Sequence, residues 1–263
     1  MITISPVKTN KDIQKFVQFS YDLYKNCKQW IPPLFQEELN NFNPKKNPVF
    51  ENASANLFLA YKNNEIVGRV AVIINRNEIE QQGIEKVRFG WFDAIDNQEV
   101  FKKLLDTVIQ IGRANNLKYL EGPMGFSNLD KVGALIDGYE QEGNMTTWYN
   151  YPYYIKHFKA LGLVPEKTFV ENKFQFSKVT TGTQFERGAK IVTEKYKVKL
   201  INFTKTKEIL PYIDEMFQLF NSSYAQLSSF VAVSPKQIDF LKKKYIPMIN
   251  PEYIKFVVDQ NQK

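Results

Sequence analysis

The strongest constraint on the fold is a pair of apolar, β-rich runs separated by a two-residue asparagine turn. The runs cover 56–61 and 65–75, and Asn63-Asn64 lies between them. Asparagine tolerates the left-handed backbone that tight hairpin turns require, so the two runs are expected to pair antiparallel. A third run of the same kind covers 86–95. The sequence therefore predicts an antiparallel meander of three strands.

A strongly periodic helix follows this meander. Its apolar residues recur at helical spacing within 97–114 and form one stripe: Phe101, Leu104, Leu105, Val108 and Ile111. A short strand is expected at 118–122, where Gly122-Pro123 ends it. Because a helical crossover brings the chain back to the same end of the sheet, this strand should pair in parallel.

Further elements surround this unit. Apolar periodicity predicts helices over 11–25, 35–42 and 152–161, the last one ending at Gly162, and alternation predicts a strand over 169–176. The predicted fold class is α/β (α+β), with a mixed, mostly antiparallel sheet flanked by helices. We expect the first domain to cover 1–178.

The pattern restarts after a helical linker over 179–196. A strand is predicted at 197–203, a helix at 205–221, a helix capped by Ser234-Pro235, and a strand at 253–259. Short similarities connect the two halves, such as 57–65 with 254–262. We therefore expect 197–263 to be the N-terminal part of a second, incomplete domain of the same kind, with the natural chain continuing beyond Lys263.

The composition limits which cofactors, cellular locations and partners are expected for this protein. Cys27 is the only cysteine, which excludes an internal disulfide and a cysteine metal cluster, and we expect no metal. The N-terminus lacks the pattern of a signal peptide, and no apolar run is long enough to span a membrane. A cytoplasmic location and no membrane partner are expected. The sequence carries no indication of oligomeric state.

The basic excess lies mainly in the C-terminal third. Residues 179–263 contain 13 Lys and Arg against 8 Asp and Glu, including the run Lys242-Lys243-Lys244. Without a recognition motif beside it, this charge favours the solvated side of a helix over a nucleic-acid face. We therefore expect no nucleic-acid partner.

Three strings carry a resemblance to a known family: RFGWFDAIDNQEVFKKLLDTV, GPMGFSNLD and YNYPYY. With the order of elements, they resemble bacterial tandem proteins of the GNAT (GCN5-related N-acetyltransferase) type. The resemblance covers nearly the whole chain in architecture. It implies transfer of an acetyl or acyl group from acetyl-CoA or another acyl-CoA to the amine of a small molecule or peptide.

The phosphate-binding loop of that family departs from its pattern here. GNAT enzymes carry Gln/Arg-x-x-Gly-x-Gly/Ala, whose backbone amides hold the coenzyme A pyrophosphate at a helix N-terminus. The corresponding residues are Asp96, Asn97, Gln98, Glu99, Val100 and Phe101. Asp96 and Glu99 are spaced as a capping box, which would occupy the free amides and oppose a second anion. The loop therefore does not support coenzyme A binding in 1–178.

The proton donor of the family also lacks a direct match. GNAT enzymes use a Tyr that protonates the departing thiolate, and its position is taken by Phe158, which has no proton to give. Tyr153, Tyr154 and His157 are the nearby candidates. An exposed surface residue is the simpler interpretation of His157, and aromatic packing explains the two tyrosines equally well.

The long segment 122–154 is the candidate substrate cleft. It contains several glycines and a group of polar and aromatic residues: Asn128, Asp130, Asp137, Tyr149 and Asn150. An ordered loop that covers apolar sheet is an equally good interpretation. Cys27 has no identifiable partner base and is predicted to be a small packed residue.

Two functional interpretations remain from the sequence. The first is a GNAT-type N-acyltransferase in which the N-terminal copy is non-catalytic and the coenzyme A loop of the second copy would follow residue 263. The alternative is a catalytically inactive GNAT-like module that binds a ligand or partner in the cleft at 122–154.

Overall fold

The computed structural model describes residues 1–127, 129–144, 147–178, 180, 182–227 and 230–260. The chain divides into two compact units. Unit 1 comprises Met1–Thr168 with Phe230 and Val231, and unit 2 comprises Phe169–Leu227 and Ala232–Lys263. The longest continuous part of unit 1 is thus Met1–Thr168, and the domain boundary at 178 stays a prediction. That unit 2 is a second copy of the same fold stays a prediction.

Unit 1 is built on one five-stranded sheet with the order β1-β2-β3-β4-β5. The strands are β1 Ile2–Pro6, β2 Ala53–Lys62, β3 Glu65–Asn75, β4 Lys86–Ala94 and β5 Tyr119–Glu121. The first four are antiparallel to their neighbours, and β5 is parallel to β4. Asn63 and Asn64 both have positive φ in the β2–β3 turn. The predicted meander, the parallel crossover and the fold class are confirmed.

The helices of unit 1 flank this sheet. They are α1 Asn10–Tyr24, α2 Phe35–Asn41, α3 Arg76–Gln82, α4 Gln98–Ala114 and α5 Tyr153–Ala160, with a 3-10 turn η1 at Pro48–Glu51. Strand β1 and helix α3 were not predicted, because each is too short to show clear periodicity. Thr9 begins α1 with a capping box, in which its side chain and that of Asp12 each accept from the other's backbone N–H.

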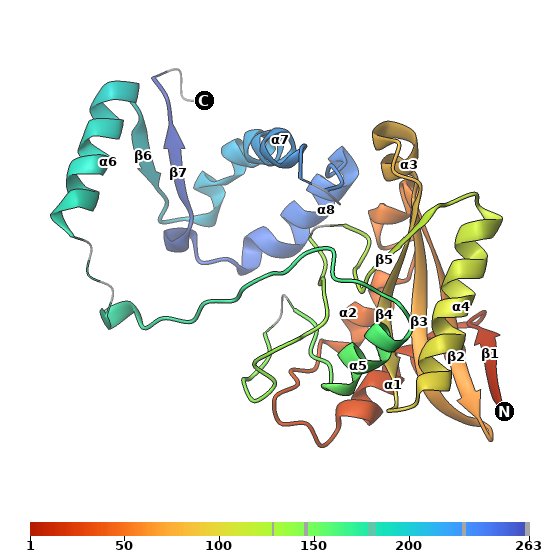
Figure 1. Ribbon diagram of the computed structural model, residues 1–263. Helices are drawn as coiled ribbons and strands as arrows, with labels where there is room; N and C mark the ends of the chain where they lie inside the picture. Colours follow the sequence, from red (N-terminus) through yellow and green to blue (C-terminus); the bar gives the residue numbers. More distant parts are fainter. Residues whose placement is uncertain (128, 145–146, 179, 181, 228–229, 261–263) are drawn as a thin grey trace. The chain divides into compact units, whose positions relative to one another are not determined.

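Two apolar cores lie on opposite faces of the sheet. On one face, α4 and α5 contribute Val100, Leu104 and Phe158 to a cluster with β3 and β4, and Figure 1 shows α4 along the sheet. On the other face, α1 contributes Phe16 and Val17 to a cluster with β2, β3 and the segment after α2. Helices on both faces bury the sheet, which explains why β3 and β4 are apolar along most of their length.

A β-bulge interrupts β4 near its C-terminal end. One extra residue lies on β4 where the β3–β4 register shifts between Arg69 and Ala71, and Trp91 has a φ of 43°. The bulge changes the alternation of side chains. Phe89 and Phe92 both enter the α4 face, and Trp91 enters the α1 face.

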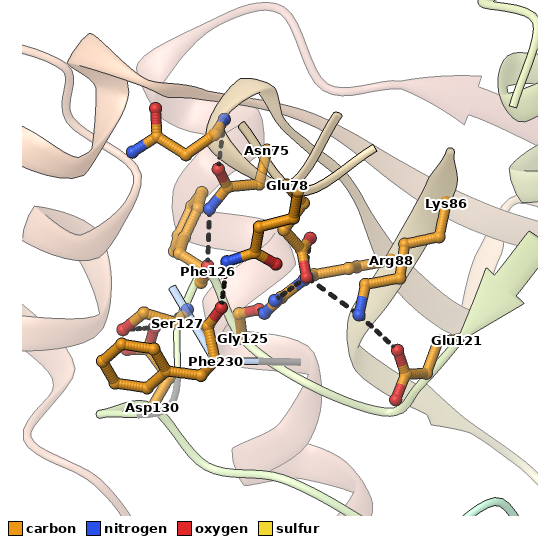
Figure 2. Close-up of polar contacts among 12 residues, drawn as sticks. Asn75, Glu78, Lys86, Arg88, Glu121, Gly125, Phe126, Ser127, Asp130 and Phe230 are labelled. Carbon is orange, nitrogen blue, oxygen red and sulfur yellow. Dashed lines mark hydrogen bonds and ion pairs between the residues drawn. The ribbon is translucent and has the colours of Figure 1, made fainter. Parts of the chain in front are cut away.

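A buried ionic cluster joins α3 to the start of β4 and to β5. Glu78 and Arg88 are both 0% exposed, and a Glu78 carboxylate oxygen accepts from Arg88 Nε at 2.7 Å. Lys86 Nζ lies 2.8 Å from Glu78 and 2.6 Å from Glu121 (Figure 2). Each buried charge therefore has an oppositely charged partner, as burial requires. Arg88 also donates to the carbonyl of Gly125, so the cluster holds the loop that follows β5.

The described residues of unit 2 form a small two-stranded sheet and three helices. Its elements are α6 Thr183–Tyr196, β6 Lys199–Asn202, α7 Ile213–Tyr224, α8 Pro235–Tyr245 and β7 Lys255–Val258, with 3-10 turns η2 Phe176–Lys178, η3 Thr206–Glu208, η4 Leu210–Tyr212, η5 Ile246–Met248 and η6 Pro251–Tyr253. Strands β6 and β7 are antiparallel. Phe203, Ile209 and Ile213 form its buried core. Ser234 caps α8 as predicted.

Two predictions for unit 2 were wrong. The segment 169–176 is not a strand, and Phe169, Val170 and Phe174 are exposed. Alternating apolar and polar residues allow an extended segment to bury one face. To form a β-strand, the segment also needs a neighbouring strand with which its backbone can hydrogen-bond. The helix expected at 205–221 is replaced by two 3-10 turns and the later α7. Pro211 cannot donate the backbone hydrogen bond that a continuous α-helix needs.

Candidate functional site

The candidate site lies where β4 and β5 separate. Only three residue pairs join these strands, the last being Arg88 with Glu121. The chain then crosses β4, and Met124 N–H donates to the Phe89 carbonyl at 2.8 Å. A methyl group on Gly90 would lie 2.2 Å from the Met124 carbonyl oxygen, so only glycine permits this crossing. Beyond it, the last residues of β4 still pair with β3 on one edge, and on the other edge they lie beside the loop before α5 and α5 itself.

Two tyrosines of α5 hydrogen-bond to the backbone N–H and carbonyl of Ala94 at this end of β4. Ala94 N–H donates to the Tyr154 hydroxyl at 3.1 Å. The Tyr153 hydroxyl donates to the Ala94 carbonyl at 2.8 Å. The Ala94 N–H, which could otherwise donate a hydrogen bond to the carbonyl of a ligand, is therefore already hydrogen-bonded within the chain.

Beside these contacts lies a buried group that we call the Asp93 cluster: Arg69, Asp93, Tyr24 and Tyr154. Asp93 Oδ2 accepts from Arg69 Nε at 2.8 Å and is 2.7 Å from Arg69 Nη2. Its Oδ1 accepts from the Tyr24 hydroxyl at 2.9 Å and from the Tyr154 hydroxyl at 3.3 Å. The two hydroxyls are 3.0 Å apart. Helix α1, strand β4 and helix α5 thus meet at one carboxylate.

The environment of the cluster keeps both phenols neutral. Burial, followed by the nearby Asp93 carboxylate, raises the pKa of Tyr24 and of Tyr154 well above the ordinary phenol value of 10.0. Tyr153 is shifted in the same direction, mainly because burial raises its pKa. Chemically, the cluster offers neutral hydrogen-bond donors next to a charge-balanced carboxylate.

A small cavity of about 20 Å³ lies against this cluster, which is room for about one water molecule. Its walls come from β4, the loop between β5 and α5, and α5 itself: Trp91, Phe92, Asp93, Pro123, Gly133, Trp148, Tyr149, Asn150 and Tyr154. The walls therefore combine polar and aromatic side chains, and the cavity is too small to hold an acyl thioester in this conformation.

The start of α4 corrects the predicted capping box. The N-cap residue is Asn97, whose side-chain oxygen accepts from Glu99 N–H at 3.0 Å and from Val100 N–H at 3.3 Å. Asp96 and Glu99 do not form the box, because Asn97 occupies the cap position that the spacing assigned to Asp96. Gln98 is the first residue of α4.

This arrangement does not fit a coenzyme A pyrophosphate. Phe101 stands where the family has glycine or alanine, and Val100 and Phe101 are both 0% exposed, with their side chains in the core between α4 and the sheet. The helix N-terminus is already capped, and two carboxylates lie beside it, which opposes a further anion. Unit 1 therefore lacks the features that the family's phosphate loop requires.

His157 also differs from the sequence prediction of an exposed surface residue. It is 7% exposed, and its Nε2 lies 2.7 Å from Asp96 Oδ1. The Phe101 ring is 4.6 Å from the imidazole, centroid to centroid. The helical pattern could not reveal this burial, because the partner carboxylate is distant in the sequence. The pair connects α5 to the loop before α4.

The predicted cleft residues fall into two groups. Tyr149 and Asn150 line the small cavity. The side-chain oxygen of Asn150 also accepts a hydrogen bond from the Leu135 backbone N–H at 2.6 Å. Asp130 instead accepts from Ser127 N–H at 2.9 Å in the turn that follows β5, and burial raises the pKa of its carboxyl (Figure 2). Asp137 is exposed. Asn128 lies outside the described residues.

Sequence reasoning missed Tyr24, Arg69, Asp93 and Trp148 as neighbours of the candidate site. A signal for Asp93 was present, since it is a carboxylate within the otherwise apolar run 89–95. A charged residue in a buried strand needs a buried partner. No local pattern identifies that partner as Arg69 on the adjacent strand.

Two further features are absent from the described part of the chain, a metal-binding cluster and a membrane-spanning helix. No group of three or more His, Cys, Asp or Glu residues there is arranged to hold a metal ion. None of the described helices combines the length and the apolar character needed to cross a bilayer.

No protein-family model matches this chain. It is 26% identical over 220 residues to Protein YghO of Escherichia coli (strain K12), which covers 84% of this chain and 55% of that protein. It is 31% identical over 140 residues to the bacterial ceramide synthase of Caulobacter vibrioides, which covers 53% of this chain and 36% of that protein. The chain spans about half or less of the length of these curated relatives.

Similar solved structures include acetyltransferases. An aminoglycoside acetyltransferase from an uncultured soil metagenomic sample, in complex with sisomicin, has a TM-score of 0.40 and 13% identity, covering 66% of this chain and 96% of that one. A predicted acetyltransferase with acetyl-CoA from Clostridium acetobutylicum has a TM-score of 0.41, 13% identity and the same coverage. The fold follows from the sheet topology itself, and scores of this size add nothing on function.

Proposed function

We propose that this protein is a GNAT-type N-acyltransferase, which transfers an acyl group from an acyl-CoA to an amine, and that unit 1 is its non-catalytic copy. The observation that carries the proposal is the separation of β4 and β5 beyond their three residue pairs. The family resemblance implies that such a splayed sheet positions the thioester beside the attacking amine. The name of the Caulobacter relative supports amide formation, because a ceramide is an amide of a fatty acid.

The contacts of Ala94 support a non-catalytic role for unit 1. A backbone N–H aimed at the thioester carbonyl would stabilise the charge that develops during attack. Here that N–H is hydrogen-bonded to Tyr154, and the adjoining cavity is about 20 Å³. The start of α4 is capped by Asn97 in the same way. In the proposed reaction, the amine forms a C–N bond with the acyl carbon, the C–S bond breaks, and the thiol leaves with a proton.

A direct assay of the full-length protein, including the part of the second copy expected to follow residue 263, tests both parts of this proposal. Palmitoyl-CoA and acetyl-CoA are supplied with a long-chain amino alcohol or a short primary amine, and release of free coenzyme A thiol is followed. We expect amine-dependent thiol release. Tyr154→Phe and Asn97→Ala should leave the rate unchanged within about twofold, because unit 1 does not bind the thioester in this proposal.

The outcomes separate the alternatives. Loss of turnover in either variant, with the fold intact, would make unit 1 the catalytic copy and contradict the proposal. No thiol release with any acyl donor and amine would favour the second candidate function, an inactive GNAT-like binding module. The occupied backbone of Ala94 and the capped α4 are the observations that favour that second function.

A further inference from the structure

An open groove of about 640 Å³ lies between α1 and α2 in unit 1, apart from the site on β4. Ile13 and Leu39 form part of its floor, and Phe42 completes it. Phe42 is 5% exposed and packs against the Trp91 ring, with a centroid distance of 4.8 Å. The apolar floor is therefore continuous with the core on this face of the sheet.

The end of the groove beyond α2 is positively charged. Lys45 and Lys46 line it, and Lys46 Nζ donates to Asn40 Oδ1 at 3.0 Å. None of the residues that line the groove is acidic. Two carboxylates on the same helices are engaged elsewhere, since Asp12 accepts from Thr9 and Glu38 accepts from the Trp91 indole. The two lysines therefore have no carboxylate partner within the groove wall.

Amide side chains supply further hydrogen-bond donors along the rim. Asn10 and Gln14 both line the groove and are exposed. Within the described part of the chain, neither side chain hydrogen-bonds to another residue. Their N–H groups are thus available to an oxygen-rich ligand.

We propose that this groove binds a single-chain anionic lipid, with a carboxylate at the lysine end and an alkyl chain along the apolar floor. A volume of about 640 Å³ is in the range of small-molecule sites. The carboxylate would gain charge-assisted hydrogen bonds from Lys45 and Lys46, and the alkyl chain would cover Ile13, Leu39 and Phe42. The inference does not depend on acyl transfer by this protein.

Titration of sodium dodecanoate, kept below its micelle concentration, tests the proposal by calorimetry. We expect saturable binding of about one molecule per chain. The double variant K45A/K46A should weaken binding by about tenfold or more, and Leu39→Ala should weaken it by a smaller factor. The matched control is K102A/K103A, another exposed lysine pair, on α4, which should bind as the unchanged protein does. Dodecyltrimethylammonium, with the same chain and a positive head group, should not bind.

Three results would overturn the proposal. They are the absence of saturable dodecanoate binding, equal binding of the cationic amphiphile, and equal weakening by the two lysine-pair variants, which would indicate a non-specific basic surface. Thermal unfolding of each variant identifies a loss of fold, and the exposed lysine variants keep the test valid if Leu39→Ala is unstable. Because no acyl donor is present, failure here would leave the thiol-release assay unaffected.

Discussion

Both ends of β4 bury an arginine against a carboxylate, and the two ends differ in what surrounds the pair. At the start of the strand, Arg88 and Glu78 are fully enclosed, and Lys86 adds a second cation to the same carboxylate. At the other end, Asp93 is held by Arg69 and also accepts from two phenols beside a small cavity. The first pair holds α3 and the crossing loop in place, whereas the second lies beside the small cavity at the end of β4.

This comparison shows that a buried ion pair is not by itself a sign of a functional site. The Glu78 pair connects secondary-structure elements, and it lines neither the small cavity beside Asp93 nor the groove between α1 and α2. The Asp93 pair has neutral donors and an adjoining space. The difference in neighbours, rather than the charge, is what makes the Asp93 cluster the candidate.

Removing the charge of Glu78 should have the largest effect. Glu78→Gln leaves Arg88 and Lys86 buried without their common carboxylate, and Lys86 then relies on Glu121. We expect a loss of about 3–5 kcal/mol in the free energy of unfolding, measured by denaturant titration. Glu80→Gln, an exposed residue on the same helix, should change it by less than about 0.5 kcal/mol. Equal effects of the two substitutions would contradict the buried ionic cluster.

Asp93→Asn should cost less than Glu78→Gln. Arg69 keeps the Phe16 carbonyl as an acceptor at 2.8 Å, and the amide oxygen of Asn can still accept one hydrogen bond. We expect a loss of about 2 kcal/mol in the free energy of unfolding. Asp106→Asn, which breaks the exposed pair with Lys102, is the control and should cost at most about 0.5 kcal/mol. An Asp93 effect as large as that of Glu78 would remove the distinction between the two ends.

Tyr154→Phe should change how the free energy of unfolding depends on pH above pH 10. The folded-state pKa of Tyr154 is raised above the ordinary 10.0, so its contribution to stability is complete below pH 10 and is lost as the pH rises toward the folded pKa. Above pH 10, the unchanged protein should lose about 1.4 kcal/mol more per pH unit than the variant. At pH 7, the variant should itself be less stable by about 1–3 kcal/mol, because Ala94 N–H loses its partner. Identical slopes in the two proteins would show that Tyr154 does not titrate with unfolding.

Asn97→Ala should give the smallest effect and tests the corrected cap of α4. Loss of the cap should lower the free energy of unfolding by about 0.5–2 kcal/mol. Asp96→Ala should cost less, because the Asp96 side chain is 66% exposed and caps no backbone N–H of α4 in the structure. The reverse order of the two effects, measured by thermal unfolding, would restore the cap that the sequence spacing suggested.

The fold was predictable where local patterns decide the structure. The Asn63-Asn64 turn and the stripe of α4 give the meander and its parallel crossover without knowledge of distant contacts. Short elements such as β1 and α3 carry too few residues to show a period, and their positions depend on packing. The segment 169–176 has the period of a strand but no partner, so the pattern alone overestimated its structure.

The candidate site was less predictable, because its contacts join distant residues. Tyr153, Tyr154, Tyr149 and Asn150 were identified from the sequence as candidates, and they meet at one end of β4. The contacts of Asp93 with Tyr24 and Arg69 depend on the sheet register and on the bulge at Trp91. The predicted cap of α4, Asp96, is one residue before the observed cap, Asn97. Asp and Asn are both good N-cap residues, so the spacing alone cannot decide which of these two neighbours caps the helix.

The close crossing at Gly90 offers a marker for comparing related sequences. Any side chain at this position would collide with the carbonyl of Met124 and force the loop away from β4. A relative with Ala or a larger residue here must therefore route its loop differently. This single alignment column would thus separate the relatives that can share the loop path seen here from those that cannot. Glycine at position 90 is a requirement of the close crossing, and any other residue there signals a different path.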